Sequence, residues 1–142
     1  MSRSVKLRER DIEKTCSDFL SLDGWRMLKT DPVSNRALGK GFGEKGMADC
    51  LYIRYRPWLV EVHVGQKKPG DDPWMKVVTG QAEVIWCEYK SPRGRAAPHQ
   101  LAWHKAERAR GALTLIAGQD FEASIEGLMG WYRSSGLMRR NI

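Results

Sequence analysis

Glu88 and Lys90 stand two residues apart at the end of an apolar run, in the stretch EVIWCEYKSPRG. Residues two apart in a β-strand point to the same side of the sheet. We therefore expect this carboxylate and this ammonium side by side, with Cys87 and Tyr89 on the opposite side. Burying a charge is costly unless it is paired or bound to a ligand. Charged residues at the end of a core strand therefore require a partner or a bound ligand.

A second acid, Asp49, opens another expected strand, Met47 to Tyr55. If the two strands pair, Asp49 and Glu88 meet, and adjacent carboxylates stay ionised more readily with a cation between them. Oxygen ligands favour Mg²⁺, which takes few protein carboxylates and keeps water ligands that phosphate oxygens can replace. Lys90 beside that ion would orient or deprotonate a water, or stabilise charge developing on a phosphate.

A simpler interpretation is an ion pair between Glu88 and Lys90 at a strand end, where such pairs are common and contribute little to stability. Glu61 and His63 have the same spacing in an alternating strand, and we expect them to face solvent. The Glu-x-Lys spacing alone therefore does not identify a site.

The elements that would position these residues follow from hydrophobic periodicity and from Gly and Pro. A first helix, about Val5 to Leu22, carries one apolar face of Ile12, Cys16, Phe19 and Leu20. The later expected elements are a strand over 25–30, a loop over 31–46, strands over 47–55, 58–64, 74–82 and 83–90, a helix from Pro98 to Gly111, a buried strand over 112–118 and a helix capped by Asp120. The order α-β-β-(β-β)-β-α-β-α predicts an α/β fold, with a mixed central sheet flanked by helices.

The chain of 142 residues is long enough for one domain, and we expect a single domain over 1–142. The stretch from about 56 to 82 is expected to be a β-hairpin insertion whose turn is rich in Gly, Pro and Lys. It would contact DNA or a partner subunit.

The order of motifs resembles the VRR-NUC domain, the virus-type replication-repair nuclease branch of the PD-(D/E)xK superfamily. The resemblance spans roughly Leu7 to Ala117 and departs from the family at the insertion, where the family has a short turn. Each motif is weak alone, and five in order on the expected elements are fairly specific. The matching residues are Glu9, Gly46 with Asp49, Glu88 with Lys90, Gln100 with Trp103, and Gly111.

The resemblance implies a restriction-endonuclease-like core and a Mg²⁺-dependent DNA endonuclease, with Mn²⁺ as a substitute. Asp49 and Glu88 would bind the metal with the Tyr89 carbonyl, and Glu9 would assist through a water or a second metal. Lys90 would activate the attacking water, with Gln100 near it. Products would carry 5′-phosphate and 3′-hydroxyl ends. Small stand-alone members resemble Holliday-junction resolvases, which implies branched DNA, a homodimer and a role in replication, repair or recombination.

Two alternatives stay open: a catalytically inactive DNA-binding module of the same fold, and a restriction or nicking nuclease on duplex DNA. The acid of the first helix is also open. On a helical wheel of about 100° per residue, Glu9 lies inside the buried stripe and Glu13 at its edge. We prefer Glu9 and keep Glu13 as the reserve.

The net charge of +7 suits a phosphate-rich partner such as DNA. His99 and His104 are expected on the surface or facing DNA, not as ligands. The basic residues expected to hold phosphates from loops, unless they are ordinary solvated charges, are Lys40, Lys45, Arg93 and Arg95.

Cys16, Cys50 and Cys87 are far apart in sequence and form no CxxC pair, which predicts three reduced, buried thiols. The N-terminus has no apolar signal-peptide core, and no run approaches the roughly 20 apolar residues that span a bilayer. We expect no membrane contact, and a cytoplasmic protein of a bacterium or phage that acts at the nucleoid.

Overall fold

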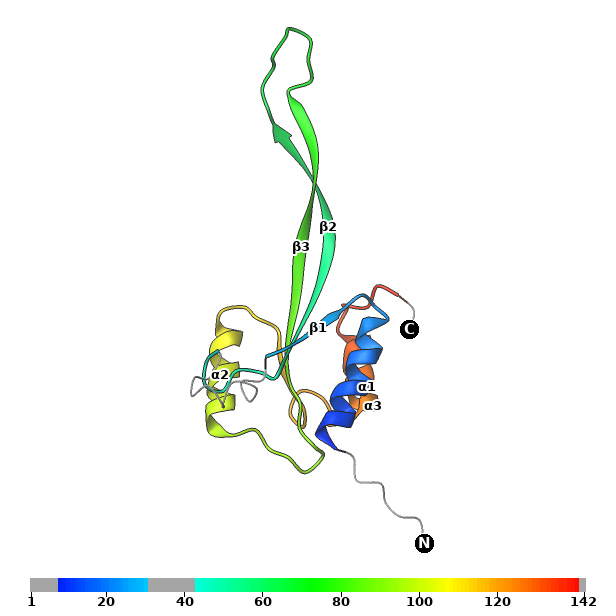
Figure 1. Cartoon of the computed structure of the whole chain (residues 1–142), viewed down its shortest axis with the longest axis vertical. Helices are drawn as coiled ribbons and strands as arrows, with labels where there is room; N and C mark the ends of the chain where they lie inside the picture. Colours follow the sequence, from blue (N-terminus) through cyan, green and yellow to red (C-terminus); the bar gives the residue numbers. More distant parts are fainter. Residues whose placement is uncertain (1–7, 31–42, 141–142) are drawn as a thin grey trace. The chain divides into compact units, whose positions relative to one another are not determined.

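The computed structural model describes residues 8–30 and 43–140, apart from the side chains of Pro57 and Trp58. These residues form a mixed α/β fold, which confirms the class expected from the sequence (Figure 1). The elements, in chain order, are α1 (Glu9–Ser21), β1 (Arg26–Lys29), β2 (Cys50–His63), β3 (Trp74–Glu88), α2 (Pro98–Ala109), β4 (Thr114–Ile116) and α3 (Ile125–Ser134).

The strands form one four-stranded sheet in the order β1-β2-β3-β4. β1 runs antiparallel to β2, with Lys29 opposite Cys50, and β4 runs parallel to β3, with Ile116 opposite Glu88. The sheet is therefore mixed, as expected. The β3–β4 connection contains α2, because parallel neighbours need a crossover.

The expectation of two separate inserted strands is wrong, because they are continuous with their neighbours. β2 runs without a break to His63, and β3 runs from Trp74 to Glu88. Pro57 lies within β2. It lies beyond Ile53, the last residue that β1 pairs with β2, so one edge of β2 is open there and proline is tolerated.

Two compact units divide the described chain. The first unit consists of the chain up to Ile53 and from Val84 onward. It contains the three helices, β1 and β4. The other is Arg54–Glu83, hereafter the hairpin, within which the expected insertion over about 56–82 falls. Val64 N donates to Pro73 O at 2.7 Å, which closes the turn between the two strands of the hairpin.

The first unit has its core between the sheet and the α1–α3 pair. The buried face of α1 consists of Ile12, Cys16, Phe19 and Leu20, the four residues expected from periodicity. Phe19 meets Tyr132 of α3 edge to face at 5.8 Å, and Trp25 Nε1 donates to Tyr132 Oη at 2.9 Å. On the other side, α2 packs Trp103 against Trp86 of β3 at 5.2 Å. Cys16, Cys50 and Cys87 are buried free thiols, as expected.

The last helix begins later than expected. Its N-cap is Ser124, whose Oγ accepts from Gly127 N at 3.0 Å, and not Asp120. Asp120 instead accepts from Ile116 N at 2.7 Å and pairs with Arg108 at 2.7 Å, so its carboxylate stabilises the end of β4. No helix within 8–30 and 43–140 is long and apolar enough to cross a membrane.

Candidate active site

Two acids far apart in sequence meet where β2 begins and β3 ends. Asp49 immediately precedes β2, and Glu88 is the last residue of β3, the neighbouring strand. Asp49 N donates to Glu88 Oε2 at 3.1 Å. The Glu88 side chain is only 1% exposed. A carboxylate buried this completely requires polar partners, because desolvation disfavours its charged form.

Those partners are Lys90 and Gln100. Lys90 Nζ lies 3.2 Å from Glu88 Oε1, and Gln100 Nε2 donates to the same oxygen at 2.6 Å. Gln100 Oε1 in turn accepts from Ala97 N at 2.8 Å, which ties the start of α2 to the site. Glu88 and Lys90 therefore form the ion pair of the simpler interpretation, with Glu88 buried and Lys90 16% exposed.

Tyr89 points to the opposite side of the strand, as the alternation predicts. It is fully buried, and its hydroxyl lies 2.6 Å from that of Tyr52, which lies 2.8 Å from Ser17 Oγ. The Tyr89 side chain therefore belongs to the core, and only its backbone is available on the side of Glu88 and Lys90.

The loop before Asp49 is fixed against α2 by contacts that the motifs alone do not predict. Gly46 has φ +85°, and a Cβ added there would lie 2.2 Å from the backbone oxygen of His99. Glu44 Oε2 accepts from Trp103 Nε1 at 2.8 Å. Glu44 was missed by sequence reasoning, and the only signal available was an acid in the Gly-rich loop upstream of Asp49. Trp103 is buried and acts in packing as well as in this bond.

The two candidate acids of α1, Glu9 and Glu13, differ in exposure. Glu9 is exposed, so the prediction that it lies within the buried stripe is wrong. It is the first residue of α1, and the buried face begins only at Ile12. Glu13, expected at the edge of the buried stripe, is only 14% exposed and accepts from Lys29 Nζ at 2.6 and 2.7 Å. Sequence reasoning missed Lys29.

Both carboxyl groups of the site have raised pKa values. Burial, then the charge of Glu88 and then that of Glu9, raise the pKa of Asp49 to about 7, although Lys29 and Lys90 oppose the shift. Glu9 therefore acts on Asp49 through its charge while remaining exposed. Burial also raises the pKa of Glu88, against the lowering effect of Lys90 and the Asp49 N–H. Two neighbouring carboxyl groups with raised pKa values form a site that a cation would stabilise.

The donor set fits a hard divalent cation. Among the described residues, no group of three His, Cys, Asp or Glu side chains is arranged to hold a metal. Asp49 and Glu88 supply two carboxylates, which suits Mg²⁺ because it binds through one or two carboxylates and completes its shell with water and phosphate oxygens. The buried Glu88 carboxyl beside the half-buried Asp49 carboxyl, both with raised pKa values, is the structural observation that favours such an ion.

No family model, curated protein sequence or solved structure matches the chain. The resemblance to the VRR-NUC domain is therefore carried by the motifs. In the structure, four of the motif residues lie together, namely Asp49, Glu88, Lys90 and Gln100.

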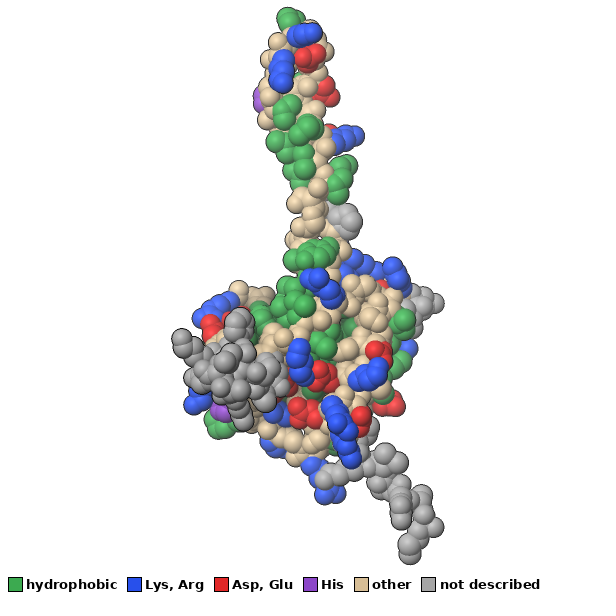
Figure 2. Space-filling model, in the orientation of Figure 1, with side chains coloured by type: hydrophobic (Ala, Val, Ile, Leu, Met, Phe, Trp, Pro, Cys, Tyr) green, Lys and Arg blue, Asp and Glu red, His purple; other side chains and the backbone are tan. Residues whose placement is uncertain are grey.

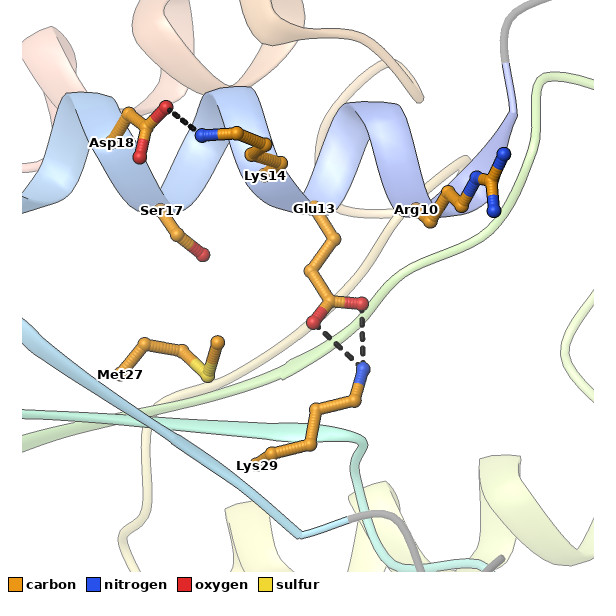
Figure 3. Close-up of a pocket in the computed structure, with 7 residues that line it drawn as sticks. All are labelled: Arg10, Glu13, Lys14, Ser17, Asp18, Met27 and Lys29. Carbon is orange, nitrogen blue, oxygen red and sulfur yellow. Dashed lines mark hydrogen bonds and ion pairs between the residues drawn. The ribbon is translucent and has the colours of Figure 1, made fainter.

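A surface pocket of about 350 Å³ lies between α1 and β1 (Figure 3). Lys29 links it to the site, because its charge acts on Asp49 and its ammonium binds Glu13 in the pocket wall. Burial alone would lower the pKa of Lys29, but the hydrogen bond to Glu13 and the nearby carboxylates raise it. Lys29 is therefore a stable cation there. The pocket is lined by Arg10, Glu13, Lys14, Ser17, Asp18, Met27 and Lys29.

Of the four basic residues expected to hold phosphates, the structure describes three. Lys45, Arg93 and Arg95 are exposed on loops, and Lys40 lies outside the described residues. Glu61 and His63, which have the same spacing as Glu88 and Lys90, are exposed, as expected.

His104 contradicts its expected surface position. It is 1% exposed, and neither ring nitrogen has a hydrogen-bond partner among the described residues. Burial, and secondarily the charge of Arg108, lower its pKa to about 4. It packs edge to face on Trp103 at 5.2 Å, so it is a core residue. His99 is exposed, as expected.

Proposed function

We propose that this chain is a Mg²⁺-dependent DNA endonuclease with a restriction-endonuclease-like core of the VRR-NUC type. The observation that carries the proposal is the buried Glu88 carboxylate, which accepts from Asp49 N and Gln100 and pairs with Lys90. A folded protein gains little from burying an acid beside a second acid, whereas a cation site requires both.

Each residue has a role that its position supports. Asp49 and Glu88 would hold Mg²⁺, or Mn²⁺ in its place, with the Tyr89 carbonyl as a further ligand and Glu9 acting through a water. The ion would polarise the phosphate and neutralise charge that develops on it. Lys90 orients the attacking water and stabilises negative charge, since its ammonium carries donors. Gln100 fixes the Glu88 carboxylate, and the reaction is an in-line displacement at phosphorus.

The proposed substrate is branched DNA. The net charge of +7 favours a phosphate backbone, and the exposed Lys45, Arg93 and Arg95, with Lys40, would contact it. Cutting two strands requires two sites, which a two-fold pair of chains would supply.

The test is cleavage of a labelled four-way junction, a flap and a plain duplex with Mg²⁺, Mn²⁺ or EDTA. We expect metal-dependent cleavage that Glu88→Ala and Lys90→Ala reduce by at least about 10²-fold, the scale of a lost catalytic group. Glu122→Ala is the matched control, because it removes an exposed glutamate that lies outside both the site and the hairpin. Cleavage that persists in EDTA, or that survives Glu88→Ala, would overturn the assignment.

The same assay distinguishes the two alternatives. Junction binding without cleavage under every metal condition would identify a DNA-binding module that lacks catalysis. Efficient cutting or nicking of the plain duplex, with no preference for the branched substrates, would identify a restriction or nicking role. Comparing Glu9→Gln with Glu13→Gln then decides which acid of α1 assists, since Glu9 acts on Asp49 and Glu13 is bound to Lys29.

A further inference from the structure

The hairpin has open strand edges within the described residues. β1 pairs with β2 only as far as Ile53, and β4 pairs with β3 only from Trp86 onward. The hairpin, Arg54–Glu83, is therefore a two-stranded ribbon, and such a ribbon is at best marginally stable alone in water. Additional contacts to one of its faces would stabilise it.

One face of the hairpin carries its three most exposed large apolar side chains among the described residues, Val78, Leu59 and Tyr55. The His63 and Trp74 rings meet at 5.1 Å, and a Cβ on Gly80 would lie 3.7 Å from the Tyr55 ring, so these residues share a face. By alternation Leu59 and Val78 lie on it too. The exposed fractions are 70% for Val78, 60% for Leu59, 57% for Tyr55 and 52% for Trp74. We call this set, with Glu61 and Lys76, the hairpin face.

Figure 2 shows hydrophobic side chains along the hairpin in the upper part of the view. The opposite face is less exposed where it is apolar, with Val62 at 41%, Met75 at 50% and Val64 at 54%. That face also carries an ion-pair cluster, in which Arg54 pairs with Glu83 at 3.0 Å and Arg56 approaches the same carboxylate at 3.9 Å. An exposed apolar patch rimmed by polar groups is typical of a protein interface.

The charge of the hairpin disfavours DNA as the occupant. It carries five basic and four acidic residues, a net charge of +1, so the rest of the chain carries +6 of the total +7. Phosphate binding would require an excess of basic residues on the face itself. In a pair of chains, the residues outside the hairpin repel each other because both sets are strongly basic. The two hairpins are nearly neutral and can approach without this repulsion.

The hairpin face is also complementary to itself. By alternation its charged members are one acid, Glu61, and one base, Lys76, and neither has an ion-pair partner among the described residues. In a two-fold contact a patch meets its own copy, so residue i contacts j and j contacts i. Glu61 of each copy can then meet Lys76 of the other, around the shared apolar patch of Leu59 and Val78.

We propose that the hairpin face docks on the same face of a second copy of this chain, forming a two-fold dimer. The inference does not depend on nuclease activity, because it rests on the exposure and charge of the hairpin alone. The apolar patch supplies the affinity, and the two Glu61–Lys76 pairs fix the orientation of the copies.

The test is the mass of the full-length protein by sedimentation across a wide concentration range, without DNA or metal. We expect dimers for the unmodified protein and for Met75→Glu, which alters an exposed residue on the opposite face. Val78→Glu is expected to weaken dimerisation at least about tenfold, since it buries a charge in the contact. Circular dichroism must show that each variant remains folded, and Val78→Thr, a milder change, replaces Val78→Glu if that variant unfolds.

Charge exchange tests the orientation. Glu61→Lys alone and Lys76→Glu alone should each weaken self-association, and an equimolar mixture of the two variants should restore dimers. A monomeric unmodified protein would overturn the proposal. Equal dissociation of the dimer by Met75→Glu and by Val78→Glu would also overturn it. The same holds for an open series of larger assemblies in place of dimers. A Val78→Glu variant that stays dimeric but loses DNA binding would overturn it as well.

Discussion

Gln100 Nε2 donates to Glu88 Oε1 at 2.6 Å while its own Oε1 accepts from Ala97 N at 2.8 Å. One amide side chain therefore caps the first turn of α2 and holds the candidate metal ligand. The orientation of Glu88 depends on a helix that begins ten residues later in the sequence.

Replacing Gln100 by Ala is expected to lower cleavage by about 10–100-fold, the usual effect of losing a group that positions a metal ligand. Stability should fall by only about 1 kcal/mol, the value of a helix cap. Activity and thermal unfolding measured together check this. Gln81→Ala, an exposed amide on the hairpin, is the control. Equal activity in both variants would contradict the role of Gln100.

Replacing Asp49 by Asn is expected to stabilise the protein at pH 8. The folded pKa of about 7 lies above the ordinary value of 3.8, so the ionised carboxyl destabilises the fold increasingly as the pH rises from 3.8 to 7. This pKa difference corresponds to about 4 kcal/mol in the free energy of unfolding. We reduce that value to about 2 kcal/mol because the Asp49 carboxyl is only partly buried. Chemical denaturation at pH 5 and pH 8 tests this. A variant less stable than the unmodified protein at pH 8 would refute it.

The same pKa predicts how metal affinity changes with pH. Below about pH 7 a cation must displace the proton of Asp49, so its apparent affinity should fall by up to about tenfold per pH unit. Calorimetric titration with Mn²⁺ between pH 5.5 and 8.5 measures this. An affinity that is constant across the range would show that Asp49 is not a ligand.

His104 is expected to make the fold sensitive to mild acid. Its folded pKa of about 4 lies below the ordinary 6.5, so protonation favours unfolding as the pH falls from 6.5 to 4, with no penalty above 6.5. His104→Leu should therefore be more stable than the unmodified protein at pH 5, by up to about 2 kcal/mol for 1.5 pH units. His99→Leu, at an exposed position, should leave the pH profile of unfolding unchanged.

Gly46→Ala is expected to disrupt the loop that carries Asp49. The substitution combines a positive φ with a Cβ placed 2.2 Å from the His99 oxygen. We therefore expect the free energy of unfolding to fall by more than the roughly 1–3 kcal/mol that backbone strain alone would cost. Gly65→Ala separates the two effects, because Gly65 also has a positive φ, +78°, but no atom lies within 4 Å of its added Cβ. Equal destabilisation of the two variants in urea would show that the close contact with α2 is unimportant.

Local patterns in the sequence determined much of this protein. Periodicity identified the four buried residues of α1, alternation placed Glu88 opposite in direction to Tyr89, and Gly and Pro marked the limits of α2. These patterns succeed because 3.6- and 2-residue periods decide which side chains are buried, whatever the partner element. They did not show that the strands expected over 58–64 and 74–82 are continuous with their neighbours, since only pairing decides whether a strand continues.

Only the tertiary structure decided which charges meet. Asp49 and Glu88 are 39 residues apart and touch because β2 and β3 are neighbours in the sheet. The wheel placed Glu9 in the core, yet it is exposed, and Lys29 binds Glu13 through a contact across elements. His104 is buried although the charged Lys105 follows it directly. Burial and Coulomb energy depend on distances through space, which sequence spacing does not determine beyond a single element.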